Sequence, residues 1–196
     1  MIARVWIGAA LGLLVGCRSR PAEAGPQTCA PTTSSLAAEA SATGLKGQYR
    51  LQLVASSGDN AGSTSAGELQ LLPSGTAYRR RTMSTAQDTT NSYPLYGSTD
   101  VGLEAVGAVA GDLSSEDPAR PGVLVIQMPP RSDTSGARVL LRLGADANRQ
   151  DLVRFDGGYT VLRVREIAGA GFAGDWESGA PLPRAGGHFC AVRRDG

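Results

Sequence analysis

His188 is the only histidine in the 196 residues, and this limits the chemistry that the chain can perform. A nucleophilic serine or cysteine needs a base beside it, and a zinc site needs clustered His, Cys, Asp or Glu. His188 follows Gly186 and Gly187 at the expected start of a strand, and the chain contains no Gly-x-Ser-x-Gly motif or phosphate-binding loop. We therefore expect no catalytic residue, no metal site and no cofactor. The alternative is a hydrolase with paired carboxylates, although nothing in the sequence selects a pair.

Two clusters of charge are the remaining candidates for a binding site. The loop at 112–117 carries three acids and two serines but lacks the glycine and spacing of an EF-hand, so we interpret it as solvated. Arg79, Arg80 and Arg81 are consecutive, and in a strand Arg80 faces away from the other two. If Arg80 points inward, it binds an anionic ligand or pairs with a buried acid. The other interpretation is an edge strand that its charges protect from pairing with another chain.

The first 17 residues have the organisation of an export signal. Arg4 precedes an apolar run, Val5 to Val15, of 11 residues, which is shorter than the roughly 20 residues that span a bilayer. Leu14-Val15-Gly16-Cys17 follows and resembles the bacterial lipobox at all four positions. That resemblance implies cleavage before Cys17 and acylation of Cys17. Two or more acyl chains hold a protein stably on a membrane, so it implies a lipoprotein anchored to the cell envelope.

The residue after the cysteine and the charge balance narrow the expected partners. Arg18 stands where inner-membrane lipoproteins of Gram-negative bacteria typically carry Asp, so the resemblance implies the outer membrane in an organism that has one. After cleavage, 18 basic and 18 acidic side chains remain. A neutral domain makes no electrostatic case for nucleic acid. We expect the membrane as a partner through the lipid anchor.

The two cysteines left after acylation are expected to pair. Exported proteins enter oxidising compartments, where Cys29 and Cys190 would form a disulfide; the alternative is a buried free Cys190 and a loose Cys29. Residues 18–43 contain 19 Ala, Gly, Pro, Ser or Thr among 26, with Leu36 the one large aliphatic residue. Such a segment buries too little apolar surface to order itself. We predict a signal peptide at 1–16, a lipidated cysteine and flexible tether at 17–43, and a folded domain at 44–196.

The folded domain shows the alternation of half-buried strands. Gly and Pro make up 37 of the 196 residues, about 19%, which disfavours long helices. Apolar and polar residues alternate in eight to ten short segments from Tyr49 to Arg193, with turn residues such as Asp156-Gly157-Gly158 between them. We predict an all-β, antiparallel up-and-down meander, closed into a barrel of about eight strands. A two-layer β-sandwich is the alternative.

Two tripeptides give a family resemblance. Gly47-Gln48-Tyr49 opens the first predicted strand, and Gly174-Asp175-Trp176 opens one of the last. The domain resembles the calycins, a group that includes lipocalins and avidins, in which a Gly-x-Trp strand packs its ring across the closed barrel end against an Arg from the last strand. The resemblance implies Trp176 and Arg193 as a structural pair at the barrel end. Calycins carry Gly-x-Trp on the first strand, whereas this chain has Gly-x-Tyr there.

Three functions follow from these features. The first is a non-enzymatic module that binds a small apolar or anionic ligand in the barrel, with Tyr49, Arg80 and Trp176 as pocket residues. The second is an envelope accessory or protein-interaction lipoprotein, such as an inhibitor, with a filled barrel and no ligand. The third is the hydrolase with an acidic site. A cavity favours the first function, and an exposed apolar patch favours the second.

Overall fold

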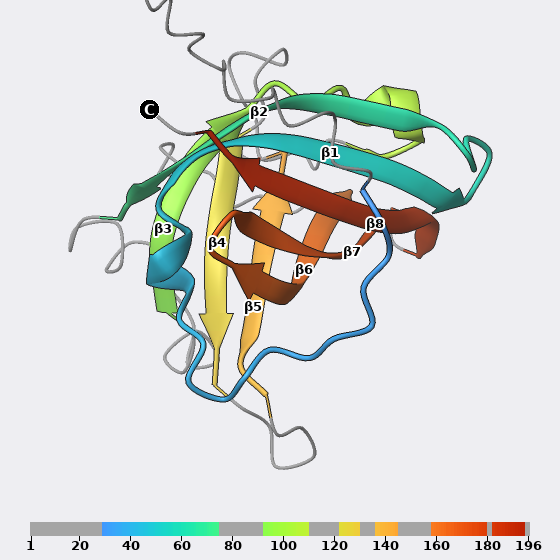
Figure 1. Cartoon of the computed structure of the whole chain (residues 1–196). Coiled ribbons are helices and arrows are strands. Elements are labelled where there is room, and N and C mark those ends of the chain that lie inside the picture. The colour runs from blue at the N-terminus through green and yellow to red at the C-terminus, as the bar shows by residue number, and fades with distance from the viewer. Residues whose placement is uncertain are drawn as a thin grey trace, which may run out of the picture.

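Eight antiparallel strands form a closed barrel, in which each strand pairs with the next and β8 pairs with β1 (Figure 1). The computed structural model describes residues 29–74, 92–109, 122–129, 136–144, 158–179 and 182–194. The strands are β1 (Gly47–Ser57), β2 (Thr64–Pro73), β3 (Ser92–Thr99), β4 (Gly122–Met128), β5 (Arg138–Leu143), β6 (Tyr159–Ala168), β7 (Gly171–Gly179) and β8 (Pro183–Arg193). The up-and-down barrel predicted from the sequence is confirmed, and the sandwich alternative is wrong because the sheet closes on itself.

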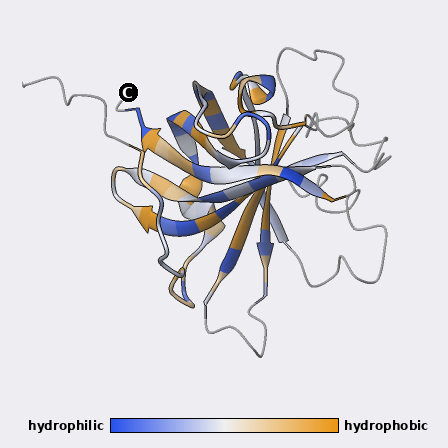
Figure 2. Ribbon diagram, turned by 90° about the vertical axis from the view of Figure 1, so that its right-hand side faces the viewer, coloured by the Kyte–Doolittle hydropathy of each residue, from blue (hydrophilic) through white to orange (hydrophobic). Residues whose placement is uncertain are grey.

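Alternate residues of each strand point into the barrel, so hydrophobic and hydrophilic positions alternate along the ribbon (Figure 2). In β5, for example, Val139, Leu141 and Leu143 are buried, and the residues between them are partly exposed. This period of two is the ordinary geometry of a strand with one face in the core. The inward side chains belong to one hydrophobic cluster that also includes residues outside the strands.

Aromatic rings and glycines share the space inside the barrel. Phe172 lies between two rings, with its centroid 5.0 Å from that of Tyr49 and 6.0 Å from that of Phe189, both in edge-on geometry. Trp176 is paired across β7 and β8 with Gly187. A side-chain carbon on Gly187 would collide with the carbonyl oxygen of Val54. Glycine therefore lets β1 and β8 approach closely beside this ring.

Two predicted segments differ from the structure. The sequence pattern predicts one or two strands between Leu95 and Val109, but β3 ends at Thr99 and a short 3-10 helix, η3 (Leu103–Val106), follows. The Gly and Pro residues from Ser178 to Gly187 predict a break between strands over that whole stretch. β7 instead runs to Gly179 and β8 begins at Pro183, because its glycines serve close strand approach and not chain reversal.

Residues 29–46, which we call the strap, run along the outside of the barrel before β1 begins (Figure 1). The predicted disulfide is present: Cys29 is bonded to Cys190 of β8, with the two Cα atoms 5.6 Å apart. Leu36 is 7% exposed and belongs to the hydrophobic cluster, and the carbonyl of Ala37 accepts a hydrogen bond from the amide of Ala137 at 3.4 Å. The strap is thus held at its start and in its middle.

The last part of the strap closes one end of the barrel. The side chain of Gln127 in β4 accepts from the amide of Ala42 at 3.0 Å and donates to the carbonyl of Ala40 at 3.4 Å. The 3-10 helix η1 (Ala42–Leu45) follows, with Ala42 and Leu45 fully buried. The prediction of a flexible tether is therefore wrong for residues 29–43. A covalent bond, backbone hydrogen bonds and one well-placed leucine replace the apolar area that this segment lacks.

Candidate functional site

The closed end of the barrel is built around Tyr49 and Arg193, which are paired across β1 and β8. The Arg193 guanidinium lies 5.0 Å from the centroid of the Tyr49 ring and donates to the Tyr49 hydroxyl at 2.7 Å. It also donates to the carbonyls of Lys46 at 3.1 Å and Gly44 at 3.3 Å. The Tyr49 hydroxyl in turn donates to the Leu45 carbonyl at 3.0 Å. These bonds satisfy carbonyls at the end of η1, which have no partner within so short a helix.

The Tyr49 phenol titrates above its ordinary range. Burial raises its pKa, and this effect exceeds the lowering by the positive charge of Arg193. The phenol therefore keeps its proton and serves as a hydrogen-bond donor at neutral pH. Among the described residues, Tyr49 and Arg193 thus cap this end of the barrel.

Trp176 is part of the barrel interior and is not the partner of Arg193. Its indole nitrogen donates to the carbonyl of Val54 at 3.1 Å, and the side chain is 2% exposed. Gly187, the residue across from it on β8, lies six positions before Arg193. The calycin resemblance implied that Arg193 packs against Trp176, whereas in the structure Arg193 contacts Tyr49. Tyr49 of the Gly-x-Tyr tripeptide on the first strand fills that place, and only the position of this tripeptide in the chain could have signalled it.

The predicted ligand-pocket residues do not come together in a described cavity. Tyr49 and Trp176 are core side chains with 0% and 2% exposure. Arg80, with the rest of its arginine cluster, and the acidic loop at 112–117 lie outside the described residues, as does Cys17. The sequence pattern indicated that Tyr49 and Trp176 face the barrel interior, but it could not distinguish residues that line a pocket from residues that pack in the core.

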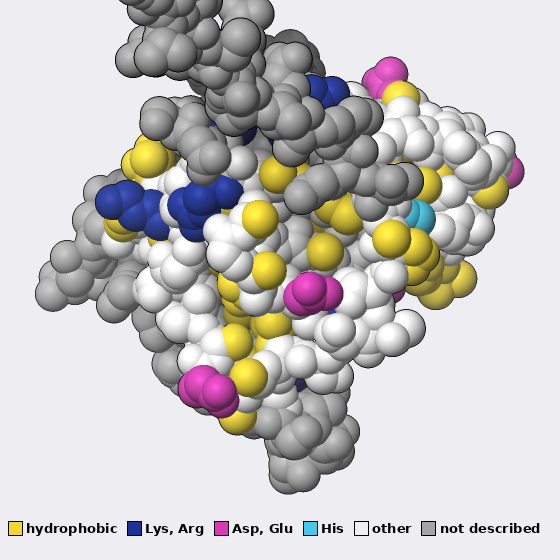
Figure 3. Space-filling view, viewed as in Figure 1, with side chains coloured by type: hydrophobic (Ala, Val, Ile, Leu, Met, Phe, Trp, Pro, Cys, Tyr) yellow, Lys and Arg dark blue, Asp and Glu magenta, His cyan; other side chains and the backbone are white. Residues whose placement is uncertain are grey.

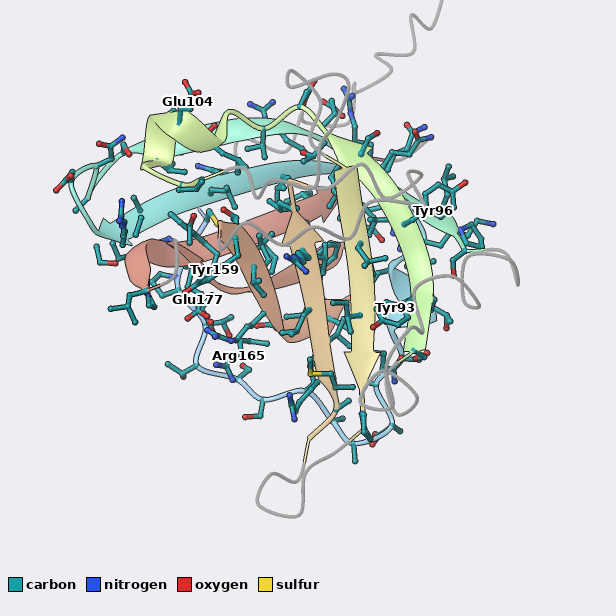
Figure 4. The ribbon with its side chains drawn as sticks, turned by 180° about the vertical axis from the view of Figure 1, so that it is seen from behind. Tyr93, Tyr96, Glu104, Tyr159, Arg165 and Glu177 are labelled. Atoms are coloured by element: carbon teal, nitrogen blue, oxygen red, sulfur yellow. A yellow bond between two sulfur atoms is a disulfide. The ribbon has the colours of Figure 1, made fainter. Side chains whose placement is uncertain are left out.

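The segment 101–109 covers the other end of the barrel. Val101, Leu103 and Val106 are buried there, within the hydrophobic cluster. On one side, the Asn60 side chain donates to the carbonyls of Glu104 and Ala105, at 3.1 and 3.2 Å. In Figure 4 the Glu104 side chain points away from the barrel.

The same segment is fixed on the opposite side of the barrel by β6 and β7. The amide of Val109 donates to the Ser178 hydroxyl at 2.7 Å, and the Thr160 hydroxyl donates to the Val109 carbonyl at 2.6 Å. Ser178 and Thr160 are themselves 2.8 Å apart. These two hydroxyls, buried and fully bonded, are used to attach the cover. The described part of the mouth is therefore closed by backbone and apolar side chains.

The outer wall of β6 and β7 carries an ion-pair network. Arg163 pairs with Asp175 at 3.3 Å and with Glu177 at 2.5 Å, and Arg165 pairs with Asp175 at 2.5 Å. Partial burial alone would lower the pKa of Arg163, but the hydrogen bonds and charges of Glu177 and Asp175 raise it above its ordinary value. Arg165 and Glu177 are labelled in Figure 4 on this wall. Half-exposed pairs of this kind stabilise weakly, and their charges satisfy one another.

His188 lies on the outer wall of β8, where it contacts the strap. Its Nε2 atom is 3.2 Å from the carbonyl oxygen of Cys29. A carbonyl only accepts, so Nε2 carries the proton, while Nδ1 is buried with no hydrogen-bond partner. Asp175 is its cross-strand neighbour, but the Asp175 oxygens bind Arg163 and Arg165. In Figure 3 the single histidine, in cyan, shows only a small surface. The arrangement fits a residue that holds the strap.

A hollow of about 280 Å³ lies on the outer wall where β1, β2 and the end of β3 meet. It is lined by Arg50, Ala66, Gly67, Glu68 and Asp100. Arg50 and Glu68 are paired across β1 and β2. The hollow thus combines one positive and two negative side chains over a small-residue floor.

Local packing sets the positions of the two acids in the hollow. The Asp100 carboxylate accepts from the Glu68 amide at 2.5 Å, and the Glu68 carboxylate pairs with Arg194 at 2.7 Å. A side chain on Gly67 would collide with Asp100 and with the backbone of Val101. The Arg50 side chain lines the hollow beside these acids. Such a set of charges suits a dipolar group, with an anionic end toward Arg50 and a cationic end toward Asp100. Residues so far apart in the chain offered no signal from which this hollow could be foreseen.

The described residues contain neither a metal-binding cluster nor a helix that could span a membrane. Among the described residues, no three His, Cys, Asp or Glu side chains gather where they could hold a metal ion. No helix of these residues is both long and apolar enough to cross a bilayer. Comparison of the chain with protein-family models, with curated proteins and with solved structures gives no match.

Proposed function

We propose that this protein is an exported lipoprotein, acylated at Cys17, whose barrel is a non-enzymatic binding module that meets its partner on its outer wall. The pattern of residues 1–17 supports the lipid anchor. The Cys29–Cys190 disulfide supports export, because disulfides persist in oxidising compartments and are rare in the cytosol.

The apolar side chains that pack inside the barrel support the choice of the outer wall as the binding surface. Buried side chains from all eight strands form one cluster, and η1 and the segment 101–109 add apolar side chains at the two ends. A small-molecule pocket usually has a volume of about 300–1,000 Å³, and the large side chains of Trp176 and Tyr49 occupy space inside the barrel, with 2% and 0% exposure. Of the functions considered from the sequence, a filled barrel with an external partner therefore fits best.

The hollow at Arg50, Glu68 and Asp100 is the contact that we assign to this partner. It offers both signs of charge beside small residues, which matches a polar protein surface or a zwitterionic group better than an apolar one. The ion-pair network of β6 and β7 is a less suitable contact, because all four of its charged side chains bind one another. In the hollow, Glu68 pairs with Arg194, while the Asp100 carboxylate accepts from a backbone amide.

A small apolar ligand inside the barrel is the second candidate. The observation that favours it is the way the segment 101–109 is attached: it crosses the mouth, and hydrogen bonds hold it at its two sides. Asn60 and Thr160 donate to its carbonyls, and Ser178 accepts from the amide of Val109. A cover attached at separate points can open by breaking few bonds.

The lipid anchor is tested by metabolic labelling with radioactive palmitate. Label and membrane retention are expected in the wild-type protein and should both be lost in Cys17→Ala. A wild-type protein without label would overturn the anchor.

The binding surface is tested by placing a photo-crosslinking residue at Ala66, on the floor of the hollow, in the full-length protein in cells. A discrete crosslinked product is expected, and Arg50→Glu should abolish it. Arg184→Glu, a charge reversal at an exposed position on β8, is the matched control and should leave it unchanged. Native mass spectrometry of the same preparation distinguishes the second candidate: a bound small molecule that persists in Arg50→Glu would favour the barrel interior instead.

A further inference from the structure

The disulfide attaches Cys29, at the start of the strap, to Cys190 on the outer wall of β8. Phe189 and Ala191 of β8 point into the core, with 0% and 1% exposure, so Cys190 between them points outward. Its neighbours across the sheet are Gln52 of β1 and Ala173 of β7. The disulfide to Cys29 therefore joins the strap to the outer wall of β8, far along the strand from η1.

The strap between this disulfide and β1 is seated along its length. Thr32 donates to the Glu166 carboxylate at 3.2 Å, Leu36 is buried, and Gln127 binds the backbone near η1. Everything from Cys29 onward thus moves with the barrel. The chain that separates Cys17 from the barrel is then residues 18–28 alone.

We propose that the Cys29–Cys190 disulfide sets how far the barrel reaches from the lipid surface, and that it turns the β8 wall toward that surface. This inference rests on the proposed acylation of Cys17. Cys17 and Cys29 are 12 residue steps apart, whereas Cys17 and Leu36, the first buried residue of the strap, are 19 steps apart. At about 3.5 Å per step, the maximum reach is about 42 Å with the disulfide and about 67 Å without it.

The short reach also restricts the partner. A barrel held within about 42 Å of its anchor can bind only molecules that come close to the same bilayer. The disulfide therefore favours a partner that is itself bound to, or near, the membrane that carries the acyl chains. A partner that stays farther than this distance from the bilayer would require a longer chain between Cys17 and the barrel.

Trp176 makes the distance measurable. The chain has two tryptophans, and Trp6 belongs to the segment removed with the signal peptide, so Trp176 is the single tryptophan of the mature protein. It lies on β7 beside β8, near the level of the disulfide. Full-length acylated protein is reconstituted into phosphatidylethanolamine–phosphatidylglycerol vesicles with dansyl-labelled headgroups, and energy transfer from Trp176 to dansyl reports the height of the barrel.

Two insertions of the same 12 Gly/Ser residues test whether the height of the barrel depends on the chain before the disulfide or on the whole chain up to β1. One follows Gln27, upstream of the disulfide, and the other lies between Ser34 and Ser35, two exposed strap residues downstream of it. Both lengthen the chain from Cys17 to Gly47 equally. The upstream insertion doubles the number of residue steps from Cys17 to Cys29, from 12 to 24, which raises the maximum reach from about 42 Å to about 84 Å, and should lower the transfer. The downstream insertion should leave the transfer at the wild-type value.

The outcomes distinguish this inference from the lipid anchor itself. Equal transfer changes from both insertions, or no change from either, on vesicle-bound protein would overturn the inference alone. Protein that stays out of the vesicles would overturn the anchor and the inference with it. In a Cys29→Ser, Cys190→Ser background, the downstream insertion should also lower the transfer, and the emission maximum of Trp176 checks that this variant has kept its folded core.

Discussion

Replacing Tyr49 with Phe tests the closed end of the barrel, because it removes one oxygen and keeps the ring. The Tyr49 hydroxyl donates to the Leu45 carbonyl and accepts from Arg193. Leaving a buried partner unsatisfied costs about 1–3 kcal/mol, so we expect Tyr49→Phe to lower the free energy of unfolding by about 2 kcal/mol. Arg193→Met should cost less, about 1 kcal/mol, because Arg193 is exposed and water can replace its bonds to Gly44 and Lys46.

The two changes share one hydrogen bond, so their effects should not add. The double variant should be more stable than additivity predicts by about 1 kcal/mol, the net value of one hydrogen bond. Urea unfolding followed by Trp176 fluorescence measures all four free energies. Arg184→Met is the control: Arg184 is exposed near the start of β8, and its effect should add to that of Tyr49→Phe within about 0.5 kcal/mol. A coupling between Tyr49 and Arg193 as small as that of this control would refute the reasoning.

Three further predictions concern the same core and the hollow. Because the pKa of Tyr49 is raised above its ordinary value of 10.0, the folded state holds this proton more tightly than the unfolded state. Its contribution is present below pH of about 10 and is lost as the pH rises further, so the wild-type protein should lose more stability than Tyr49→Phe between pH 9 and 11 in urea titrations; parallel losses would contradict this. Trp176→Ala, which empties a fully buried site, should cost about 3–5 kcal/mol, measured by circular dichroism during urea unfolding, and a loss below 1 kcal/mol would mean that the ring is not in the core. Gly67→Val should displace Asp100 and cost about 1–3 kcal/mol, whereas Ala66→Val, at an exposed position of the same strand, should change stability by less than about 0.5 kcal/mol; equal effects would exclude the close approach at Gly67.

The fold class was predictable because strand periodicity is a local property. Val139, Leu141 and Leu143 alternate with polar or partly exposed residues, and the period of two needs no knowledge of the rest of the chain. Closure of the sheet followed from the need to cover its edges. The end of β3 was not predictable in the same way, because Leu103 and Val106 look like strand residues and become buried in η3 only after the barrel mouth exists.

The disulfide was predictable from chemistry and the strap was not. Two cysteines left in an exported chain are expected to pair, and Cys29 and Cys190 do so. The order of residues 29–43 depends instead on single contacts, such as the burial of Leu36 and the bonds from Gln127, which composition cannot reveal. The composition of residues 29–43 gives only their total apolar area. Their order depends instead on the position of Leu36, which is buried against the barrel.

Local features of the chain predicted the alternating strands and the pairing of the two cysteines, because the first depends on residues that are neighbours and the second on residue type alone. Tertiary structure alone decided that Tyr49, and not Trp176, meets Arg193, and that Arg50, Glu68 and Asp100 surround one hollow. Both depend on the register between strands that are distant in sequence. That register is set by the closure of the whole barrel, in which side chains of all eight strands must pack at once.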